Sequence, residues 1–134
     1  MNVRILSLLA ACSAAIAVGS SAPAQNARSP KAEKKLAEAL EGRVAGEPVK
    51  CIREGSKMRV IDDATIVFRD RGVVYVQLPR GACRGLSNGR ALVRNSTGST
   101  RLCAGDINSI VDFSTGLGSD ACIYGDFIPY NKPG

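Results

Sequence analysis

Short apolar runs separated by turn residues dominate the chain from Cys51 onward. β-Branched and aromatic side chains fill these runs, and turn-forming residues stand between them. The runs cover residues 58–61, 65–69, 73–78, 91–94, 107–113 and 122–129. We therefore expect a mainly β domain, built as a small antiparallel barrel or curved meander of about five or six strands.

Alternation along the first three runs directs one set of side chains toward a core. These side chains are Met58, Val60, Ile66, Phe68, Val74, Val76 and Leu78. The opposite face is less than fully polar, because it carries Ile61, Val67 and Val73. We expect the first face to be the inner one.

A short helix is predicted before the strands. Ser29 suits the N-cap position and Pro30 the first helical position. Leu36 and Leu40 stand four residues apart among alanines and charged residues, which gives a narrow apolar stripe through about Glu41, and Gly42 or Gly46 would end the helix. Two leucines make a thin face for a partner helix, so we expect the stripe to dock on the domain itself.

Residues 1–24 have the order of a removable secretory signal. Arg4 supplies the positive start, residues 5–18 form an uncharged apolar run, and small residues ending at Ala24 provide a cleavage site before Gln25. The apolar run is shorter than the roughly 20 residues that span a bilayer. We therefore predict export, with a periplasmic or extracellular location and no transmembrane helix in the mature chain.

Two processing routes remain open. Residues 9–12 resemble the lipobox of bacterial lipoproteins, in which Cys12 would be acylated and anchor the protein. The apolar run continues past Cys12, so cleavage after Ala24 is the preferred prediction. It leaves about 110 residues, which suits one domain. We expect a polar N-terminal segment with the helix over residues 25–50 and a disulfide-stapled β domain over residues 51–130.

The mature chain contains Cys51, Cys83, Cys103 and Cys122 and no histidine. An even number of cysteines in an exported chain predicts two disulfides. No two cysteines are near neighbours, whereas zinc sites and redox-active dithiols use close pairs, so we expect no metal and no cofactor. Three pairings are possible in principle. We favour Cys51 with Cys122, since the first and last segments of a small barrel often adjoin, and Cys83 with Cys103, since they flank one candidate strand.

The residues offer little for catalysis. Without histidine, the Ser-His-Asp and Cys-His routes to an activated nucleophile are closed. Asp62 and Asp63 are the best catalytic candidates, because a carboxylate pair could serve as general acid and base on a glycan. Adjacent residues on an extended chain point to opposite faces, however, and Asp-Asp between two β runs is typical of a turn. Asp106 and Asp126 each follow a glycine, but neither has the several nearby oxygens that a calcium loop requires.

The chain is mildly basic, with 18 Lys and Arg against 12 Asp and Glu. The arginines are scattered singly, without the dense runs or interleaved aromatic residues of nucleic-acid surfaces. We expect no nucleic-acid partner. If the charge is functional, an envelope protein or an anionic envelope polymer is the expected partner.

Several motifs together resemble a family of small exported bacterial four-cysteine proteins that is classified only as a domain of unknown function. The motifs lie at residues 42–52, 60–63, 65–68, 83–86, 102–103, 105–107 and 125–129, together with Tyr75, Leu78 and Cys122. The resemblance covers residues 42–130. It implies export and a four-cysteine domain, and it implies no activity, cofactor or catalytic residue.

These observations favour a non-catalytic binding or accessory domain of the cell envelope. Its loops at residues 79–90 and 95–101 would contact the partner. A small secreted enzyme inhibitor is the alternative, because disulfide-rigidified loops reduce the ordering cost of binding. A glycan-acting enzyme that uses Asp62 and Asp63 is the least favoured hypothesis.

Overall fold

The structure is a computed structural model that describes residues 28–95 and 98–134. The predicted signal, its cleavage site at Ala24 and Gln25, and Cys12 lie outside the described residues. The elements are α1 (Pro30–Leu40), β1 (Val44–Ala45), β2 (Cys51–Arg53), β3 (Lys57–Asp62), β4 (Thr65–Asp70), β5 (Val73–Gln77), the 3-10 helix η1 (Leu86–Asn88), β6 (Ala91–Arg94), β7 (Arg101–Cys103), β8 (Ile107–Asp112), β9 (Leu117–Ile123) and β10 (Phe127–Asn131).

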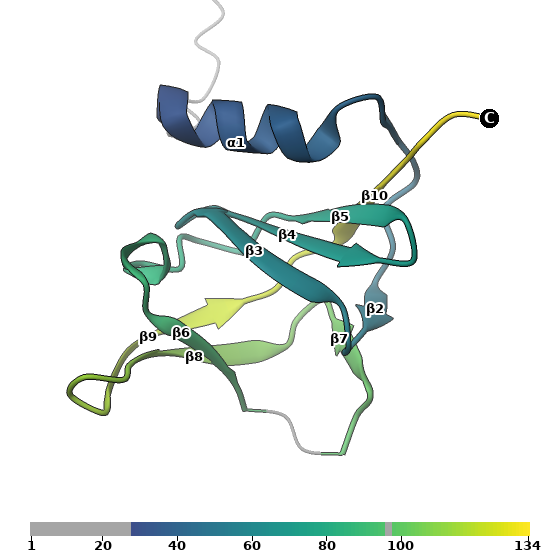
Figure 1. The fold of residues 1–134 in the computed structure, drawn as a ribbon. Helices are drawn as coiled ribbons and strands as arrows, with labels where there is room; N and C mark the ends of the chain where they lie inside the picture. The colour runs from purple at the N-terminus through teal and green to yellow at the C-terminus, as the bar shows by residue number, and fades with distance from the viewer. Residues whose placement is uncertain (1–27, 96–97) are drawn as a thin grey trace, which may run out of the picture.

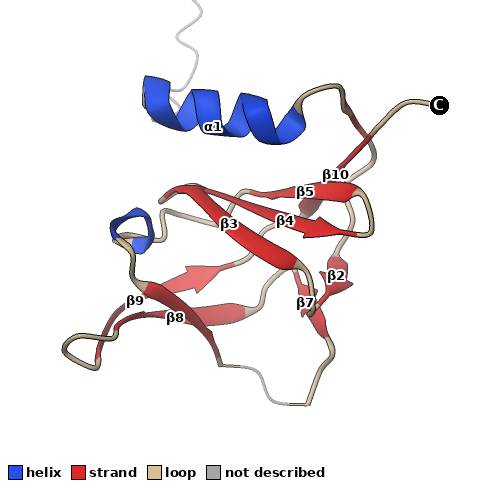
Figure 2. Ribbon diagram, in the orientation of Figure 1, coloured by secondary structure: helices blue, strands red, loops and turns tan. Residues whose placement is uncertain are grey.

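The strands form three antiparallel sheets. A five-stranded sheet has the order β1-β10-β5-β4-β3, a three-stranded sheet has the order β6-β8-β9, and β2 and β7 form a two-stranded ribbon. Figures 1 and 2 show α1 along one side of the five-stranded sheet and the three-stranded sheet on the other side. The predicted mainly β fold with one preceding helix is confirmed. The described strands do not close into a barrel, and they are more numerous than predicted.

Helix α1 begins and docks as predicted. The Ser29 hydroxyl oxygen accepts a hydrogen bond from the Ala32 N–H at 3.2 Å, and Pro30 occupies the first helical position. Leu36 and Leu40 pack against the five-stranded sheet. This contact removes their apolar surface from water, so the helix is held by packing as well as by its N-cap.

The five-stranded sheet is buried on both faces, which corrects the prediction of a single inner face. Ile66 and Phe68 face the main core between the sheets, whereas Val74 and Val76 face α1. Register explains the difference, because β4 and β5 pair Phe68 with Tyr75 and therefore turn the neighbours of Tyr75 to the helix side.

Two more side chains of the predicted inner face are exposed. Met58 and Leu78 each keep 45% of their surface accessible, because they lie at strand ends where neither α1 nor the second sheet covers them. The opposite face of the sheet, which the sequence shows to be only partly polar, is covered by α1. Ile61 and Val67 are buried there.

The segment predicted as one strand over residues 122–129 is divided between two sheets. Strand β9 ends at Ile123 in the three-stranded sheet, and β10 begins at Phe127 in the five-stranded sheet. Gly125 lies at the crossing, where a Cβ atom would come within 2.5 Å of the Leu78 carbonyl oxygen. The buried Gln77 side chain accepts from the Gly125 N–H at 2.7 Å and donates to the Gly125 carbonyl at 3.0 Å. The crossing therefore keeps its backbone hydrogen bonds without a strand partner.

Both predicted disulfide pairings are wrong. The bridges are Cys51–Cys103 and Cys83–Cys122. The first and last strands do adjoin, but they are β1 and β10, and Cys51 lies beyond β1 in the ribbon, directly opposite Cys103. Cys83 and Cys122 are both buried in the main core. Strand β6 lies between Cys83 and Cys103 in the sequence. Cys83 stays in the core, whereas the chain after β6 places Cys103 in the ribbon, so these two cysteines are not bonded to each other.

Candidate anion-binding end

The Asp62 and Asp63 carboxylates do not act together. The Asp62 carboxylate accepts from the Ala64 N–H at 2.9 Å and caps the β3–β4 turn. The Asp63 carboxylate accepts from the Gly85 N–H at 3.0 Å and the Ser87 N–H at 2.8 Å. These bonds confirm the turn interpretation, because each carboxylate already serves a separate backbone segment.

The charge state of Asp63 fits this anchoring role. Burial acts to raise the pKa of Asp63, but hydrogen bonds from Ser87 and Gly85 outweigh it and hold the pKa below its ordinary value. A general acid at neutral pH needs a raised pKa. Asp63 is therefore an ionised anchor that fixes the loop around η1 to the β3–β4 turn.

The remaining acidic candidates also have structural partners. The Asp106 carboxylate accepts from the Cys103 N–H at 2.8 Å, and Asp126 forms an ion pair with Lys50 at 2.7 Å. Within residues 28–95 and 98–134, no group of three or more Cys, Asp or Glu side chains is placed to hold a metal ion. None of the helices in the same residues is both long enough and apolar enough to cross a bilayer.

The ribbon formed by β2 and β7 places two arginines face to face. Ile52 and Leu102 are buried, so the alternate residues Arg53 and Arg101 lie on the outer face, together with the Cys51–Cys103 bridge. One backbone bond lies at each end of the ribbon, from Ala104 N–H to the Lys50 carbonyl at 2.7 Å and from Glu54 N–H to the Thr100 carbonyl at 3.1 Å, next to the arginine pair.

This pattern makes Arg53 and Arg101 a non-hydrogen-bonded pair, the type in which opposing side chains are closest. Like charges at directly opposite positions destabilise a β pair. The register therefore places two arginines directly opposite each other, at a cost to the stability of the ribbon. The Arg53 side chain extends toward Asp70, and the Arg101 side chain extends toward the Cys51 carbonyl.

A second pair of like charges lies at the same end of the molecule. Lys57 of β3 is directly opposite Arg69 of β4, and both are exposed. Arg53 connects the two pairs, since its Nε atom is 3.7 Å from the carboxylate of Asp70, the neighbour of Arg69. Figure 1 shows the ribbon beside the end of β4 and the start of β3.

A fifth cation occupies the turn between β4 and β5. Arg71 has a φ of 46°, the only positive φ among the described residues other than glycine, and Gly72 follows with a φ of 84°. Turns with two left-handed residues favour Asn-Gly or Asp-Gly, and a side chain such as arginine is strained there by about 1 kcal/mol or more. We call the five cations Arg53, Lys57, Arg69, Arg71 and Arg101 the basic end.

A shallow hollow lies between the two arginines of the ribbon. Its lining residues are Arg53, Glu54, Gly55, Thr100 and Arg101. The Glu54 carboxylate is already engaged, because it accepts from the Arg94 guanidinium at 2.8 Å. Arg53 exposes 54% of its side chain, so its guanidinium remains accessible to a ligand.

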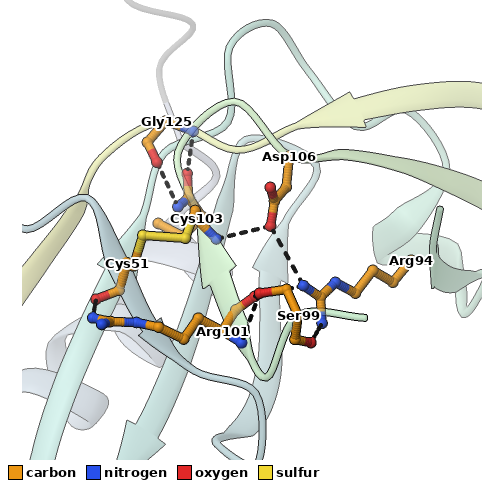
Figure 3. Close-up of a disulfide and its surroundings, with 8 residues drawn as sticks. Cys51, Arg94, Ser99, Arg101, Cys103, Asp106 and Gly125 are labelled. Carbon is orange, nitrogen blue, oxygen red and sulfur yellow. Dashed lines mark hydrogen bonds and ion pairs between the residues drawn. A yellow bond between two sulfur atoms is a disulfide. The ribbon is translucent and has the colours of Figure 1, made fainter. Parts of the chain in front are cut away.

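Arg94 supports the ribbon from beneath. Its side chain is only 16% exposed and donates to the Ser99 carbonyl at 3.0 Å and to the Arg101 carbonyl. Figure 3 shows Arg101 beside the Cys51–Cys103 bridge, and Asp106 between Cys103 and Arg94. Arg94 therefore fixes the backbone that presents Arg101, and it is not itself a free cation.

The two predicted contact loops lie apart. The loop over residues 79–90 is tied to the β3–β4 turn by Asp63, whereas Thr100 and Arg101 from the other loop lie on the ribbon. Sequence reasoning missed the basic end because its cations come from three separate segments, residues 53–57, 69–71 and 101, that only the fold brings to one end. The Arg71-Gly72 turn was the one local signal that could have indicated it.

No protein-family model, curated protein or solved structure matches the chain. The resemblance to exported four-cysteine proteins stays a prediction. The two disulfides are compatible with an exported protein.

Proposed function

We propose that the chain is an exported, non-catalytic binding domain of the bacterial cell envelope, and that its basic end binds an anionic polymer. The observation that carries this proposal is the placement of Arg53 directly opposite Arg101 on an exposed face. A phosphate or carboxylate between two guanidinium groups replaces their repulsion with charge-assisted hydrogen bonds. The repulsion that destabilises the free ribbon is therefore relieved when the ligand binds.

Two further features support the same ligand class. Lys57 opposite Arg69 costs roughly 0.2–1 kcal/mol, and the left-handed Arg71 adds about 1 kcal/mol or more. The Lys57–Arg69 pair and the left-handed Arg71 each lower the stability of the fold, and each adds positive charge to the basic end. A fold that only needed solubility could carry these charges at sites without such costs.

The arrangement favours a polymer over a single small anion. Lys57 and Arg69 lie on the face of the five-stranded sheet that carries Val67, whereas Arg53 reaches Asp70 on the opposite face. A ligand with repeated anionic groups can contact both sets, and one phosphate ion cannot. The basic end contains no aromatic residue for base stacking, so an envelope polymer fits it better than a single-stranded nucleic acid.

The test measures binding of two defined polyanions to the mature chain by calorimetry. The probes are linear polyphosphate and poly-L-glutamate, which separate phosphate from carboxylate recognition. The variant Arg53→Glu/Arg101→Glu is compared with Arg80→Glu/Arg84→Glu, which changes the same charge at two exposed arginines of another loop.

The proposal predicts that the ribbon variant loses at least about tenfold in affinity, whereas the control variant changes by less than about threefold. The affinity of the wild type should fall steadily with increasing salt. Equal losses in the two variants, or no binding of either probe, would contradict an assigned site at the basic end.

An enzyme inhibitor is a second candidate, and one observation favours it. The β8–β9 hairpin presents Phe113 in its turn, which is 79% exposed, and Leu117 at the start of β9, which is 69% exposed. The Asp112 carboxylate accepts from the Ser114 N–H and hydroxyl, so the turn is ordered before any partner binds. Inhibition of an envelope hydrolase that disappears in Phe113→Ser, with polyanion binding retained, would support this candidate.

A further inference from the structure

The two disulfides lie in different surroundings. Cys83 and Cys122 are 0% and 1% exposed, and they pack in the main core beside Leu86 and Ile110. Cys51 and Cys103 are partly exposed on the outer face of the ribbon. An external thiol can therefore approach one bridge in the folded protein, whereas the other is protected.

We propose that Cys51–Cys103 is a thiol-responsive bridge that controls the basic end. A dithiol reductant opens this bridge while Cys83–Cys122 stays closed, and opening it weakens anion binding. The second half rests on the proposed function. The first half, the order of reduction, does not depend on it.

The reaction is a two-step thiol–disulfide exchange. A thiolate of the reductant attacks the sulfur of Cys51 or Cys103, which forms a mixed disulfide and releases the other cysteine as a thiolate. The second thiol of the reductant then loses its proton, and the resulting thiolate attacks the other sulfur of the reductant, which is part of the mixed disulfide. This step releases the second cysteine thiolate, and the reductant becomes a cyclic disulfide. Two electrons pass to the bridge, and each cysteine takes up a proton from solvent.

The ribbon favours this reaction through its charges. Arg53 and Arg101 are two residues along their strands from Cys51 and Cys103, on the same face and about 7 Å away. Figure 3 shows Arg101 alongside the bridge, where its guanidinium donates to the Cys51 carbonyl at 3.5 Å. These cations attract an anionic thiolate and stabilise the thiolate that leaves.

Opening the bridge would loosen the ribbon without unfolding the domain. Each ribbon strand has three residues, and a two-stranded antiparallel pair of this size is marginal in water. Ile52 and Leu102 remain buried and keep the ribbon on the core. Without the covalent link, repulsion between Arg53 and Arg101 separates the two guanidinium groups and removes the shared anion site.

The first experiment treats the mature protein with increasing dithiothreitol without denaturant, alkylates free thiols, and maps them by mass spectrometry. We expect Cys51 and Cys103 to be alkylated at dithiothreitol concentrations that leave Cys83 and Cys122 closed. Reduction of Cys83–Cys122 first, or of both bridges together, would overturn the proposal.

The second experiment measures polyphosphate binding by the variant Cys51→Ser/Cys103→Ser and by wild-type protein in which only this bridge has been reduced and alkylated. Both should keep the far-ultraviolet circular dichroism of the wild type and lose about fivefold or more in affinity. If the double variant does not fold, the alkylated protein gives the same comparison. Unchanged affinity would refute the control of binding. Failure of the oxidised wild type to bind would instead refute the proposed function.

Discussion

Replacing Arg101 by threonine should move stability and binding in opposite directions. Two charges about 6 Å apart repel by roughly 0.7 kcal/mol in water, and a Debye length of about 8 Å at physiological salt roughly halves this value. The only hydrogen bond of the Arg101 side chain within the described residues is the 3.5 Å contact to Cys51, so little is lost in return. We expect the free energy of unfolding to rise by about 0.3–0.7 kcal/mol.

The assay is thermal and urea unfolding at low, physiological and high salt, together with calorimetry against polyphosphate. The stabilisation by Arg101→Thr should be largest at low salt and vanish near 1 M salt, while affinity falls about tenfold. Arg80→Thr is the matched control, because Arg80 is exposed and its bond to Ile123 is made by the backbone N–H, which threonine keeps. It should change neither quantity. Any measurable loss of stability at low salt, or unchanged affinity, would refute the reasoning.

Two further predictions concern residues that hold other parts of the fold. Gln77→Met leaves the buried N–H and C=O groups of Gly125 without partners, so urea unfolding should show a loss of about 2–4 kcal/mol; a loss below about 1 kcal/mol contradicts this role. Asp63→Asn removes an ionised acceptor whose pKa is raised by burial but lowered further by hydrogen bonds from Ser87 and Gly85. A depressed pKa contributes stability above the unfolded-state value and loses it as the pH falls through the folded-state value. The variant should therefore be about 1 kcal/mol less stable at pH 7, and the two unfolding curves should converge below about pH 4; a difference independent of pH would exclude this linkage.

Local signals were enough for the helix and the central strands. Ser29 and Pro30 define the start of α1 through N-cap chemistry that depends on neighbouring residues alone. The runs at residues 58–61, 65–69 and 73–78 became β3, β4 and β5 with boundaries shifted by about one residue, as is common for element ends.

Long-range pairing explains what the sequence did not reveal. The first half of β9 contains glycine, serine and aspartate, which are poor strand formers, and it is a strand because β8 pairs with it. The ribbon brings Cys51 to Cys103 across a sequence separation of 52 residues, so its register had no local signal. The disulfide pairing and the opposition of Arg53 and Arg101 both depend on that register, and both were therefore out of reach.

The central claim is that Arg53 and Arg101 together hold an anionic group. The most direct measurement is nitrogen-15-edited NMR of the arginine side chains during titration with polyphosphate. We predict saturable shifts of the Nε–H signals of Arg53 and Arg101, with smaller shifts at Arg69 and Arg71 and none at Arg80. Uniform shifts of all exposed arginines, or shifts confined to Arg80, would contradict the account.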